Sequence, residues 1–562
     1  MRVREVRSGL TVNAVAGCHV VLLGFDVDAR RRHGLRGFAV RRTDPAEGET
    51  YWMKGTKTFR SVEPSPGAGE QFSSLIHPFQ TFQWADYSAK PDRDYTYEVV
   101  PMYGDPGSLR RGDAVSVTVH TEPVEAVDHT VLFNRGSVAT QEYARRFQNR
   151  KPSDIGAAAY RWLSRGLLEG ILGFIGRAED ESWGLKGAFY EFQWPEVLDA
   201  LGAARRRRAE VEIVFDDIEG GGPHEENEAA IEEARIKGIC VPRANGRLMH
   251  NKFLVLTHRD KPRALLFGST NITENGIFGH ANCVHIVEDA EVAQAYLDYF
   301  EQLRRDPPTD RAHPDYRGWT TDRTPAPVDL PKGGMAPVFS PRADLAALDW
   351  YAEMVGGARR GVFMTFAFGM NERFRQVYGR DDDVLRMGLM EKEWNGRNKE
   401  AQIAAIRKLQ ARPNVVIAVG NRIPLSGLDQ WLGEIDRLKR EVNVRWIHTK
   451  FMLLDPLSND PIVVTGSANF SESSIDTNDE NMLVIRGSRR VADIYFGEFF
   501  RLHAHYAFRQ AVGIFLQQNP GRTVEDFASR YLVEGRDWTA DYFTPGDGNA
   551  RYLRRLYFAG EP

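Results

Sequence analysis

Apolar and polar positions follow a short-period pattern over roughly the first 120 residues of the chain. Apolar, β-branched and aromatic residues gather in short segments separated by turn-forming residues, as in 19–27, 36–44, 94–104 and 113–121. Short segments of this composition, closely spaced, are typical of the strands of an all-β domain. We therefore predict a β-sandwich domain over residues 1–125, followed by a connector over 126–155.

After residue 155 the pattern changes to helical segments that alternate with short apolar runs, which predicts an α/β sheet. Helices are expected at 157–178, 194–208 and 224–238, and strands at 183–192, 211–217 and 248–257. The same order then returns, with helices at 343–360, 399–411 and 428–442 and strands at 361–370, 414–420 and 444–455. This is an internal duplication, with copies at 156–305 and 341–503. Proline-rich, charged residues 306–340 are predicted to be a linker, and 504–562 a C-terminal extension packed on this core.

Composition restricts the class, partner and location of the protein only a little. The chain has 562 residues, a net charge of −4 and 42% hydrophobic residues, as in a globular protein, and it is not basic enough to single out nucleic acid as its partner. Its three cysteines are odd in number and far apart, which argues against a disulfide framework and shows no metal spacing. Neither a secretory signal nor a membrane span is apparent, so a cytoplasmic protein is expected.

The most specific signal is a histidine and a lysine two positions apart, present once in each copy. His250 and Lys252 lie in the first copy, and His448 and Lys450 in the second. Alternate residues of an extended chain point to the same side, so each pair presents an imidazole and an ammonium together. A Gly-Ser-x-Asn element follows each pair, and its serine comes 19 residues after the histidine in both copies. One such pair is usually structural, whereas two at one spacing indicate a functional site.

These residues resemble the signature of the phospholipase D superfamily, His-x-Lys-x4-Asp followed by Gly-Ser-x-Asn, usually twice in a chain. The second motif is complete, whereas in the first Thr257 stands where the aspartate is expected. The resemblance implies a duplicated phospholipase D-like α/β sandwich in which both motifs meet in one active site between the halves. The N-terminal segment resembles a fibronectin type III or immunoglobulin-like module, a possible docking domain for a protein partner.

The resemblance also assigns roles to residues. It implies that His250 is the nucleophile and His448 the general acid and base, with the reverse assignment open, and that Lys252 and Lys450 offset the charge of a phosphodiester. Residues expected to bind the phosphate are Ser269, Asn271, Ser467 and Asn469. Residues expected to orient the histidines are Asp455 and Glu480. If Asn282 aligns with Asn481, the first copy has Ala281 where the second has Glu480, so the two histidines should differ in carboxylate support. Glu191 could then supply a carboxylate near His250.

Physical chemistry agrees with these roles. Ammonium groups and amide or hydroxyl donors offset the charge of a phosphodiester, and two imidazoles can hold opposite protonation states near neutral pH. We therefore expect a phosphodiesterase that works through a phosphohistidine, with no metal ion or other cofactor. The frequency of activities within the superfamily favours phospholipid hydrolysis. The alternatives are a nuclease acting on DNA or RNA, and a catalytically degenerate adaptor. The oligomeric state does not follow from the sequence.

Overall fold

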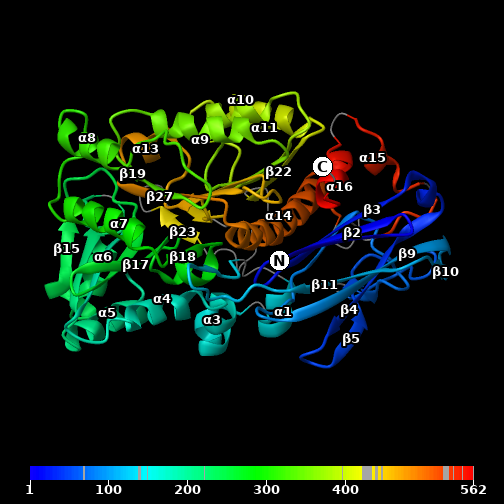
Figure 1. Cartoon of the computed structure of the whole chain (residues 1–562), viewed down its shortest axis with the longest axis horizontal. Helices are drawn as coiled ribbons and strands as arrows, with labels where there is room; N and C mark the ends of the chain where they lie inside the picture. The colour runs from blue at the N-terminus through cyan, green and yellow to red at the C-terminus, as the bar shows by residue number, and fades with distance from the viewer. Residues whose placement is uncertain are drawn as a thin grey trace.

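The computed structural model describes residues 1–67, 70–136, 141–148, 150–220, 222–394, 397–420, 433–436, 441–444, 447–522, 531–535, 537–546 and 549–560. In Figure 1 an N-terminal β-rich region, drawn in blue, lies at one end of the molecule, and the α/β part forms the other end. Over the described ranges no helix combines the length and the apolar character that crossing a bilayer requires.

The N-terminal region is all-β, as predicted, and consists mainly of two antiparallel sheets. One sheet has the order β1-β2-β3-β8, and the other has the order β10-β9-β4-β5, with β11 also paired to β9. Val12 and Phe25 of the first sheet share a buried cluster with Val99 and Val117 of the second. The elements are β1 (Arg2–Arg7), β2 (Leu10–Ala16), β3 (Val21–Val27), the 3-10 turn η1 (Ala29–Arg32), β4 (Leu35–Asp44), β5 (Glu49–Trp52), β6 (Lys54–Gly55), β7 (Phe72–Ser73), β8 (Gln83–Asp86), β9 (Asp94–Asp105), β10 (Ser108–Arg111) and β11 (Val115–His120).

The predicted duplication is present as two seven-stranded sheets with the same strand order. The first sheet runs β12-β18-β17-β16-β13-β14-β15, and the second runs β19-β27-β26-β25-β20-β21-β22. In each sheet the last three strands are parallel to one another, and the others pair antiparallel. The strands of the first sheet are β12 (His129–Phe133), β13 (Trp183–Phe189), β14 (Glu210–Asp216), β15 (Cys240–Arg243), β16 (Lys252–His258), β17 (Lys261–Gly268) and β18 (Cys283–Val287). Those of the second are β19 (Met335–Ser340), β20 (Gly361–Phe366), β21 (Leu385–Met390), β22 (Val415–Val419), β25 (Phe451–Leu454), β26 (Ile462–Gly466) and β27 (Glu480–Arg486).

Helices complete both halves. Those of the connector and the first half are α1 (Gln141–Phe147), α2 (Pro152–Ile155), α3 (Ala157–Ser164), α4 (Leu167–Gly176), α5 (Pro195–Arg206), α6 (His224–Glu233), the 3-10 turn η2 (Lys237–Ile239), the π-helical turn η3 (Asn275–Gly279) and α7 (Ala290–Leu303). The later helices are α8 (Pro314–Arg323), α9 (Ala346–Gly357), α10 (Glu372–Tyr378), α11 (Lys399–Gln410), α13 (Glu472–Asp476), α14 (Arg489–Gln518), α15 (Ala540–Phe543) and α16 (Arg551–Phe558).

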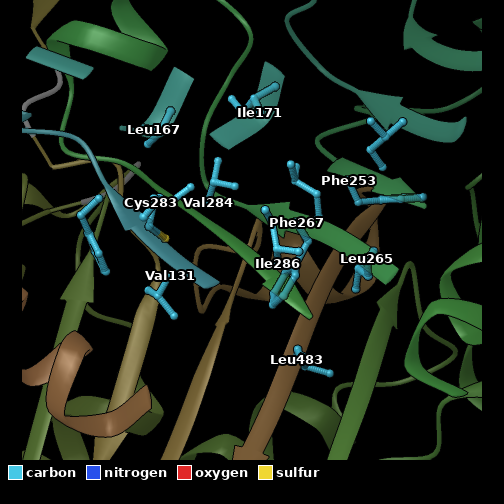
Figure 2. Packing of buried hydrophobic residues seen from close by; sticks show 14 of the residues in the cluster. Val131, Leu167, Ile171, Phe253, Leu265, Phe267, Cys283, Val284, Ile286 and Leu483 are labelled. Atoms are coloured by element: carbon cyan, nitrogen blue, oxygen red, sulfur yellow. The ribbon is translucent and has the colours of Figure 1, made fainter. Parts of the chain in front are cut away.

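Two equivalent helices, α7 and α14, join the halves. Each packs on its own sheet and also contacts the edge strand of the other sheet, β19 for α7 and β12 for α14. Figure 2 shows the buried cluster that results, with Val131, Cys283 and Ile286 of the first sheet and Leu483 of the second. The core is thus continuous between the halves, which fixes their relative position. The same aromatic contacts recur in both, because Tyr296 packs between Phe253 and Phe339, and Tyr495 between Phe451 and Phe133.

One predicted helix is interrupted. The segment 157–178 forms α3 and α4 instead of a single helix, because Arg165 and Gly166 both adopt positive φ values, 50° and 92°. Left-handed conformations end an α-helix, and glycine adopts them without steric cost. The Arg-Gly pair therefore divides an apolar pattern that is otherwise continuous.

Segments predicted to be connectors contribute to the sheets. The connector 126–155 contains β12, the edge strand of the first sheet, and the linker 306–340 contains α8 and β19, the edge strand of the second. A strand of five or six residues is too short to show a clear period, so the proline and charge around it dominated the sequence pattern.

Two further predictions need correction near the C-terminus. Where the structure describes the expected helix 428–442, it has the antiparallel strands β23 (Gly433–Asp436) and β24 (Glu441–Val444); the remaining residues of that prediction lie outside the described ranges. The C-terminal extension does not begin at residue 504, because α14 continues through it to Gln518. Beyond α14, α16 packs on β3 and β8 of the N-terminal region as well as on β21.

Candidate active site

The two motif histidines meet because each is hydrogen-bonded to the opposite half. The backbone N–H of His250 donates to the carbonyl of Asp479 at 2.9 Å, and that of His448 donates to the carbonyl of Ala281 at 3.2 Å. Both histidines lie just before a central strand, His250 before β16 and His448 before β25. Their ring centroids are 6.3 Å apart. The pairing places both imidazoles at one point between the sheets.

Both motif lysines lie in the same site and are held in the same way. Lys252 Nζ donates to the carbonyl of His250, and Lys450 Nζ to the carbonyl of His448, both at 2.6 Å. The lysines are 2% and 1% exposed. Lys252 Nζ also lies 5.0 Å from the centre of the Tyr190 ring, a cation–π contact. Two buried ammonium groups in one site attract an anion strongly.

The Gly-Ser-x-Asn elements tie neighbouring strands together beside the histidines. Gly268 and Gly466 are required because a Cβ there would lie 2.3 Å and 2.2 Å from the carbonyl oxygens of Cys283 and Asn481. The serine hydroxyl that follows each glycine accepts the N–H of an equivalent residue in each half. Ser269 accepts from Cys283 at 3.1 Å, and Ser467 accepts from Asn481 at 3.0 Å. The predicted phosphate-binding serines are thus already engaged in holding strands.

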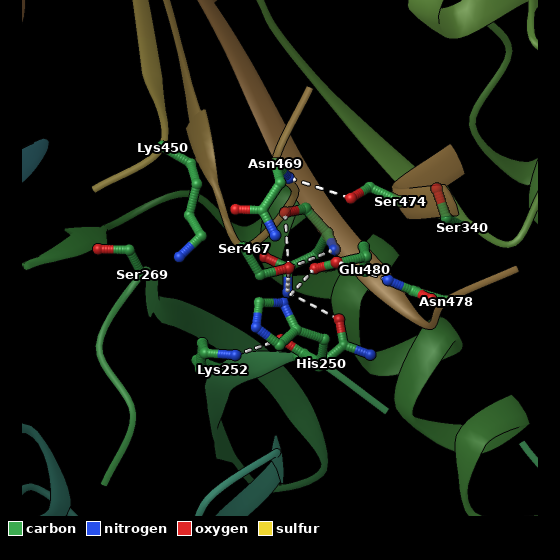
Figure 3. Close-up of polar contacts among 12 residues, drawn as sticks. His250, Lys252, Ser269, Ser340, Lys450, Ser467, Asn469, Ser474, Asn478 and Glu480 are labelled. Atoms are coloured by element: carbon green, nitrogen blue, oxygen red, sulfur yellow. Dashed lines mark hydrogen bonds and ion pairs between the residues drawn. The ribbon is translucent and has the colours of Figure 1, made fainter. Parts of the chain in front are cut away.

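The motif asparagines differ from the serines in keeping an acceptor oxygen without a described partner. Their side-chain oxygens, Asn271 Oδ1 and Asn469 Oδ1, are buried and have no hydrogen-bond partner within the described part of the chain. Figure 3 shows Asn469 directed toward the same space as Lys450 and His250. Glu191 accepts a hydrogen bond from Asn271 Nδ2, so it supports this asparagine, in contrast to the support of His250 suggested by its position in the sequence.

Glu480 orients a histidine, but the histidine of the other copy. Its Oε2 lies 2.9 Å from His250 Nδ1, and both groups are buried (Figure 3). An ionised carboxylate only accepts hydrogen bonds, so Nδ1 carries the proton and Nε2 keeps its lone pair. The nitrogen of His250 that can act as a nucleophile is therefore Nε2.

His448 has neutral acceptors in place of a carboxylate. Its Nδ1 lies 3.1 Å from the carbonyl oxygen of Ser269 and 2.9 Å from Asn282 Oδ1. The amide of Asn282 is itself fixed, because its Nδ2 donates to the carbonyl of Gly276 at 2.8 Å and its Oδ1 accepts from Ser269 Oγ. His448 Nδ1 therefore carries a proton as well, and Nε2 is again the reactive nitrogen.

The expected alignment of the two copies is wrong by one residue. Ser467 pairs with Asn481, and Ser269 pairs with Cys283, each fourteen residues on, so the residue equivalent to Glu480 is Asn282 and not Ala281. In a strand a shift of one position moves a side chain to the opposite face. The sequence contained this information, since counting from the serine gives the correct register.

Burial shifts the pKa values of Glu480 and His448. It raises the pKa of Glu480 to about 7, an effect that Lys252, Ser467, Asn478 and Lys450 oppose. The pKa of His448 lies well below its usual range, first because of burial and then because of the positive charges of Lys450, His280, Lys252 and His250. A protonated His448, which the sequence suggested for neutral pH, is therefore disfavoured in the unliganded site.

The activity is expected to fall as the pH drops through about 7. Below that pH Glu480 takes up a proton, loses its preference for the tautomer with Nδ1 protonated and can no longer balance a positive charge on His250; above it the carboxylate is ionised and keeps the proton on Nδ1. The pH profile of kcat/KM should show this acidic limb in the wild type. Glu480→Gln should be slower and should lack the limb, and an unchanged limb in this variant would assign it to another group.

Asp455 does not orient a histidine. Its carboxylate accepts the backbone N–H groups of Arg359, Arg360 and Gly361 at 2.7–2.9 Å. Asp455 follows β25, and His448 precedes it, so the aspartate lies about 16 Å along the strand from Lys450. The motif aspartate caps the start of β20. Thr257, which replaces it in the first copy, therefore removes no group from the active site.

Substitution of Asp455 is expected to affect stability and not catalysis. Asp455→Ala leaves three N–H groups without their acceptor, which should lower the free energy of unfolding by about 1–3 kcal/mol. Thermal unfolding measures the loss, and the rate per folded molecule should stay close to that of the wild type. A large fall in kcat at full folding would restore the role that the sequence motif suggested.

Sequence reasoning missed three residues of the site. Asn282 is the partner of His448, and it was hidden by the alignment. His280 was not among the predicted site residues, but its ring centroid lies 6.0 Å from that of His448. Tyr190 lies 5.1 Å from His250, ring centre to ring centre, and follows a strand without any motif of its own. Only the first of these carried a signal that could have been read in advance.

The duplicated sheets, with a histidine and a lysine from each half in one site, have the arrangement that the resemblance to the phospholipase D superfamily implied. Residues 171–304 and 397–502 match the family model described as "Cardiolipin synthase, PLD-like domain". These two segments, less than half of the chain, are thus similar to a phospholipase D-like domain. No curated protein matches the chain.

Several solved structures resemble the chain at low sequence identity. A phosphatidylserine synthase from Haemophilus influenzae is 12% identical, with 60% of this chain and 85% of the other covered and a TM-score of 0.43. Nuc, a phospholipase D family member from Salmonella typhimurium, is 22% identical over 25% of this chain and 87% of its own, with a TM-score of 0.22. A polyphosphate kinase from Porphyromonas gingivalis is 11% identical over 64% of this chain, with a TM-score of 0.37, and this chain spans about half (47%) of it.

Proposed function

We propose that this chain cleaves a phosphodiester without a metal ion, by way of a covalent phosphohistidine on His250, and that its substrate is a phospholipid. The observation that carries the proposal is the fixed orientation of the two imidazoles. Each Nδ1 is held by an acceptor, which makes Nε2 the nitrogen that can react on each ring, and the ring centroids are 6.3 Å apart. The description of the matching family supports the choice of lipid.

The first step uses His250 as the nucleophile. Its Nε2 lone pair attacks phosphorus, and the bond to the leaving oxygen breaks with its electron pair going to that oxygen, which takes a proton from His448 Nε2; the bound phosphate anion favours protonation of His448 for this step. The positive charge that forms on the His250 ring is balanced by Glu480. Lys252 and Lys450 offset the charge on the phosphoryl oxygens in a buried site, where such interactions are strongest. His250 has the carboxylate of Glu480 beside it, whereas His448 has the neutral amide of Asn282. This difference favours His250 as the nucleophile, because a carboxylate partner makes an imidazole more basic.

The second step uses His448 as a base. Its Nε2 takes a proton from water or from an alcohol, whose oxygen attacks phosphorus and restores His250. Water gives hydrolysis, and an alcohol gives a new phosphodiester. Which acceptor enters the site decides whether the chain is a hydrolase or a synthase.

The test compares phospholipid vesicles with single- and double-stranded nucleic acid as substrates, all in EDTA, for the wild type and His250→Asn. We expect release of the headgroup by the wild type alone. Cleavage of nucleic acid would make the chain a nuclease. Loss of activity in EDTA that returns with a divalent ion would contradict the metal-free route.

The adaptor alternative is tested by trapping the intermediate. After brief incubation with a phosphorus-labelled substrate and rapid denaturation, label bound to histidine is expected in the wild type. A binding module would carry none, and neither would His250→Asn.

A further inference from the structure

The segment 280–282 holds His448, and a buried asparagine of the connector holds this segment in turn. The carbonyl of Ala281 accepts the N–H of His448 at 3.2 Å, and Asn282 Oδ1 lies 2.9 Å from His448 Nδ1. Both the backbone and the ring of His448 are thus fixed by residues 281 and 282. The position of the segment therefore decides where His448 Nε2 lies relative to the substrate.

Asn134, the residue after β12, binds this segment through both ends of its amide. Its Nδ2 donates to the carbonyl of Ile277 at 2.9 Å and to that of His280 at 2.7 Å, and its Oδ1 accepts the N–H of Asn282 at 3.0 Å. The side chain is fully buried. A rotated amide would turn its oxygen toward two carbonyl oxygens, so these contacts allow one orientation. The Asn134 side chain thus connects the turn η3 to the segment 280–282.

The backbone of Asn134 is fixed as well. Its N–H donates to the carbonyl of Asn282 at 3.3 Å, which extends the pairing of β12 with β18 by one residue. Arg501 of α14 donates to the carbonyl of Asn134 at 2.9 Å and to that of Arg135 at 2.7 Å, and its Nε lies 2.7 Å from Glu498 Oε2. Asn134 is therefore anchored to one of the two helices that join the halves.

The second half holds its equivalent segment, 478–480, by an ion pair. The carboxylate of Asp479 lies 3.0 Å from Arg243 Nε, and both side chains are fully buried. The residue equivalent to Asp479 is Ala281, whose methyl group can form neither an ion pair nor a hydrogen bond. In the first half the amide of Asn134 therefore provides the support that Asp479 provides in the second.

Ser340 occupies the position equivalent to Asn134 in the second half. It lies opposite Glu480 in the pairing of β19 with β27, as Asn134 lies opposite Asn282 (Figure 3). Within the part of the chain that the structure describes, its hydroxyl makes no hydrogen bond. A serine thus fits at this position of the fold without holding the neighbouring segment.

From these contacts we infer that Asn134 is a positioning residue of the active site. It holds the segment 280–282 and thereby keeps His448 where a proton can pass between Nε2 and the substrate. The inference rests on the proposed function and extends the site to the connector, outside both motif-bearing copies. The effect should be confined to His448, because His250 is held by Asp479 and Glu480 of the other half.

The test follows the two steps of the reaction separately in Asn134→Ser. With phosphorus-labelled bis(4-nitrophenyl) phosphate, the first step releases 4-nitrophenolate, a stable anion that gains little from a proton donor, whereas the second step needs His448 as the base for water. Rapid quenching at successive times measures how fast the labelled phosphohistidine forms and how fast it disappears. We expect formation within about threefold of the wild-type rate and disappearance about 10–100-fold more slowly, because a small displacement of a reacting group has an effect of this size.

Two further variants complete the test. Ser340→Ala is the matched control and should leave both rates at the wild-type values. Arg501→Lys keeps a positive charge beside Glu498 but cannot donate to both carbonyls at once, so it should slow the second step selectively by a smaller factor. It also provides the result if Asn134→Ser does not fold.

Equal slowing of both steps in Asn134→Ser or in Arg501→Lys would indicate a general loss of structure and would overturn the inference. Unchanged rates in a folded Asn134→Ser would overturn it as well. In both cases the wild type still forms the phosphohistidine, so the proposed function stands. A wild type that forms no phosphohistidine with this probe would instead refute the proposed function itself.

Discussion

Replacement of His250 by asparagine is expected to reduce the cleavage of bis(4-nitrophenyl) phosphate by more than about 10⁴-fold, because a residue that forms the covalent intermediate has no substitute in the site. Asparagine keeps a polar side chain of similar reach but lacks the Nε2 lone pair. The backbone bond from residue 250 to the carbonyl of Asp479 does not depend on the side chain, so the fold should persist. Release of 4-nitrophenolate, measured at equal concentrations of folded protein, checks the result.

The matched control is a histidine on the same strand outside the site. His258 lies at the end of β16, where its ring packs against Trp183 with the centroids 4.3 Å apart. His258→Asn should therefore keep the wild-type rate. Substantial cleavage by His250→Asn, with His258→Asn unchanged, would contradict a nucleophilic role for His250.

The second large effect concerns the ion pair beneath the site. Arg243 Nε lies 3.0 Å from Asp479 Oδ2, both side chains are fully buried, and Arg243 also binds Asp306 of the linker. Tyr316 of α8 donates to the other oxygen of Asp479 at 2.9 Å. Asp479→Ala would leave part of a buried guanidinium uncompensated, which should lower the free energy of unfolding by about 3–5 kcal/mol.

Urea-induced unfolding measures this loss, and a surface pair provides the comparison. Arg177 and Glu288 lie 2.6 Å apart, but their side chains are 36% and 32% exposed, so Glu288→Ala should cost less than about 1 kcal/mol. Equal effects of the two substitutions would mean that burial does not control the energy of the Arg243–Asp479 pair.

Much of the catalytic fold could be predicted from the sequence because its determinants are local and repeated. The alternation of helices and apolar strands appeared twice, and the structure has the same strand order in both sheets. His250, Lys252, His448 and Lys450 were identified by one spacing found twice. The prediction failed where the signal was short or interrupted, as at β12 and β19 and at the Arg165–Gly166 break.

The sequence by itself determined the duplication, the pairs of histidine and lysine, and the glycines that allow the strands to approach. The tertiary structure alone decided which group supports each histidine. Glu480 reaches His250 across 230 positions of the chain, and Asn282 reaches His448 across 166. Such contacts depend on how the two sheets pack around α7 and α14, and no local periodicity records that packing. The same packing determined that Asp455 caps a strand, because the far end of β25 faces Arg359–Gly361 and not the site.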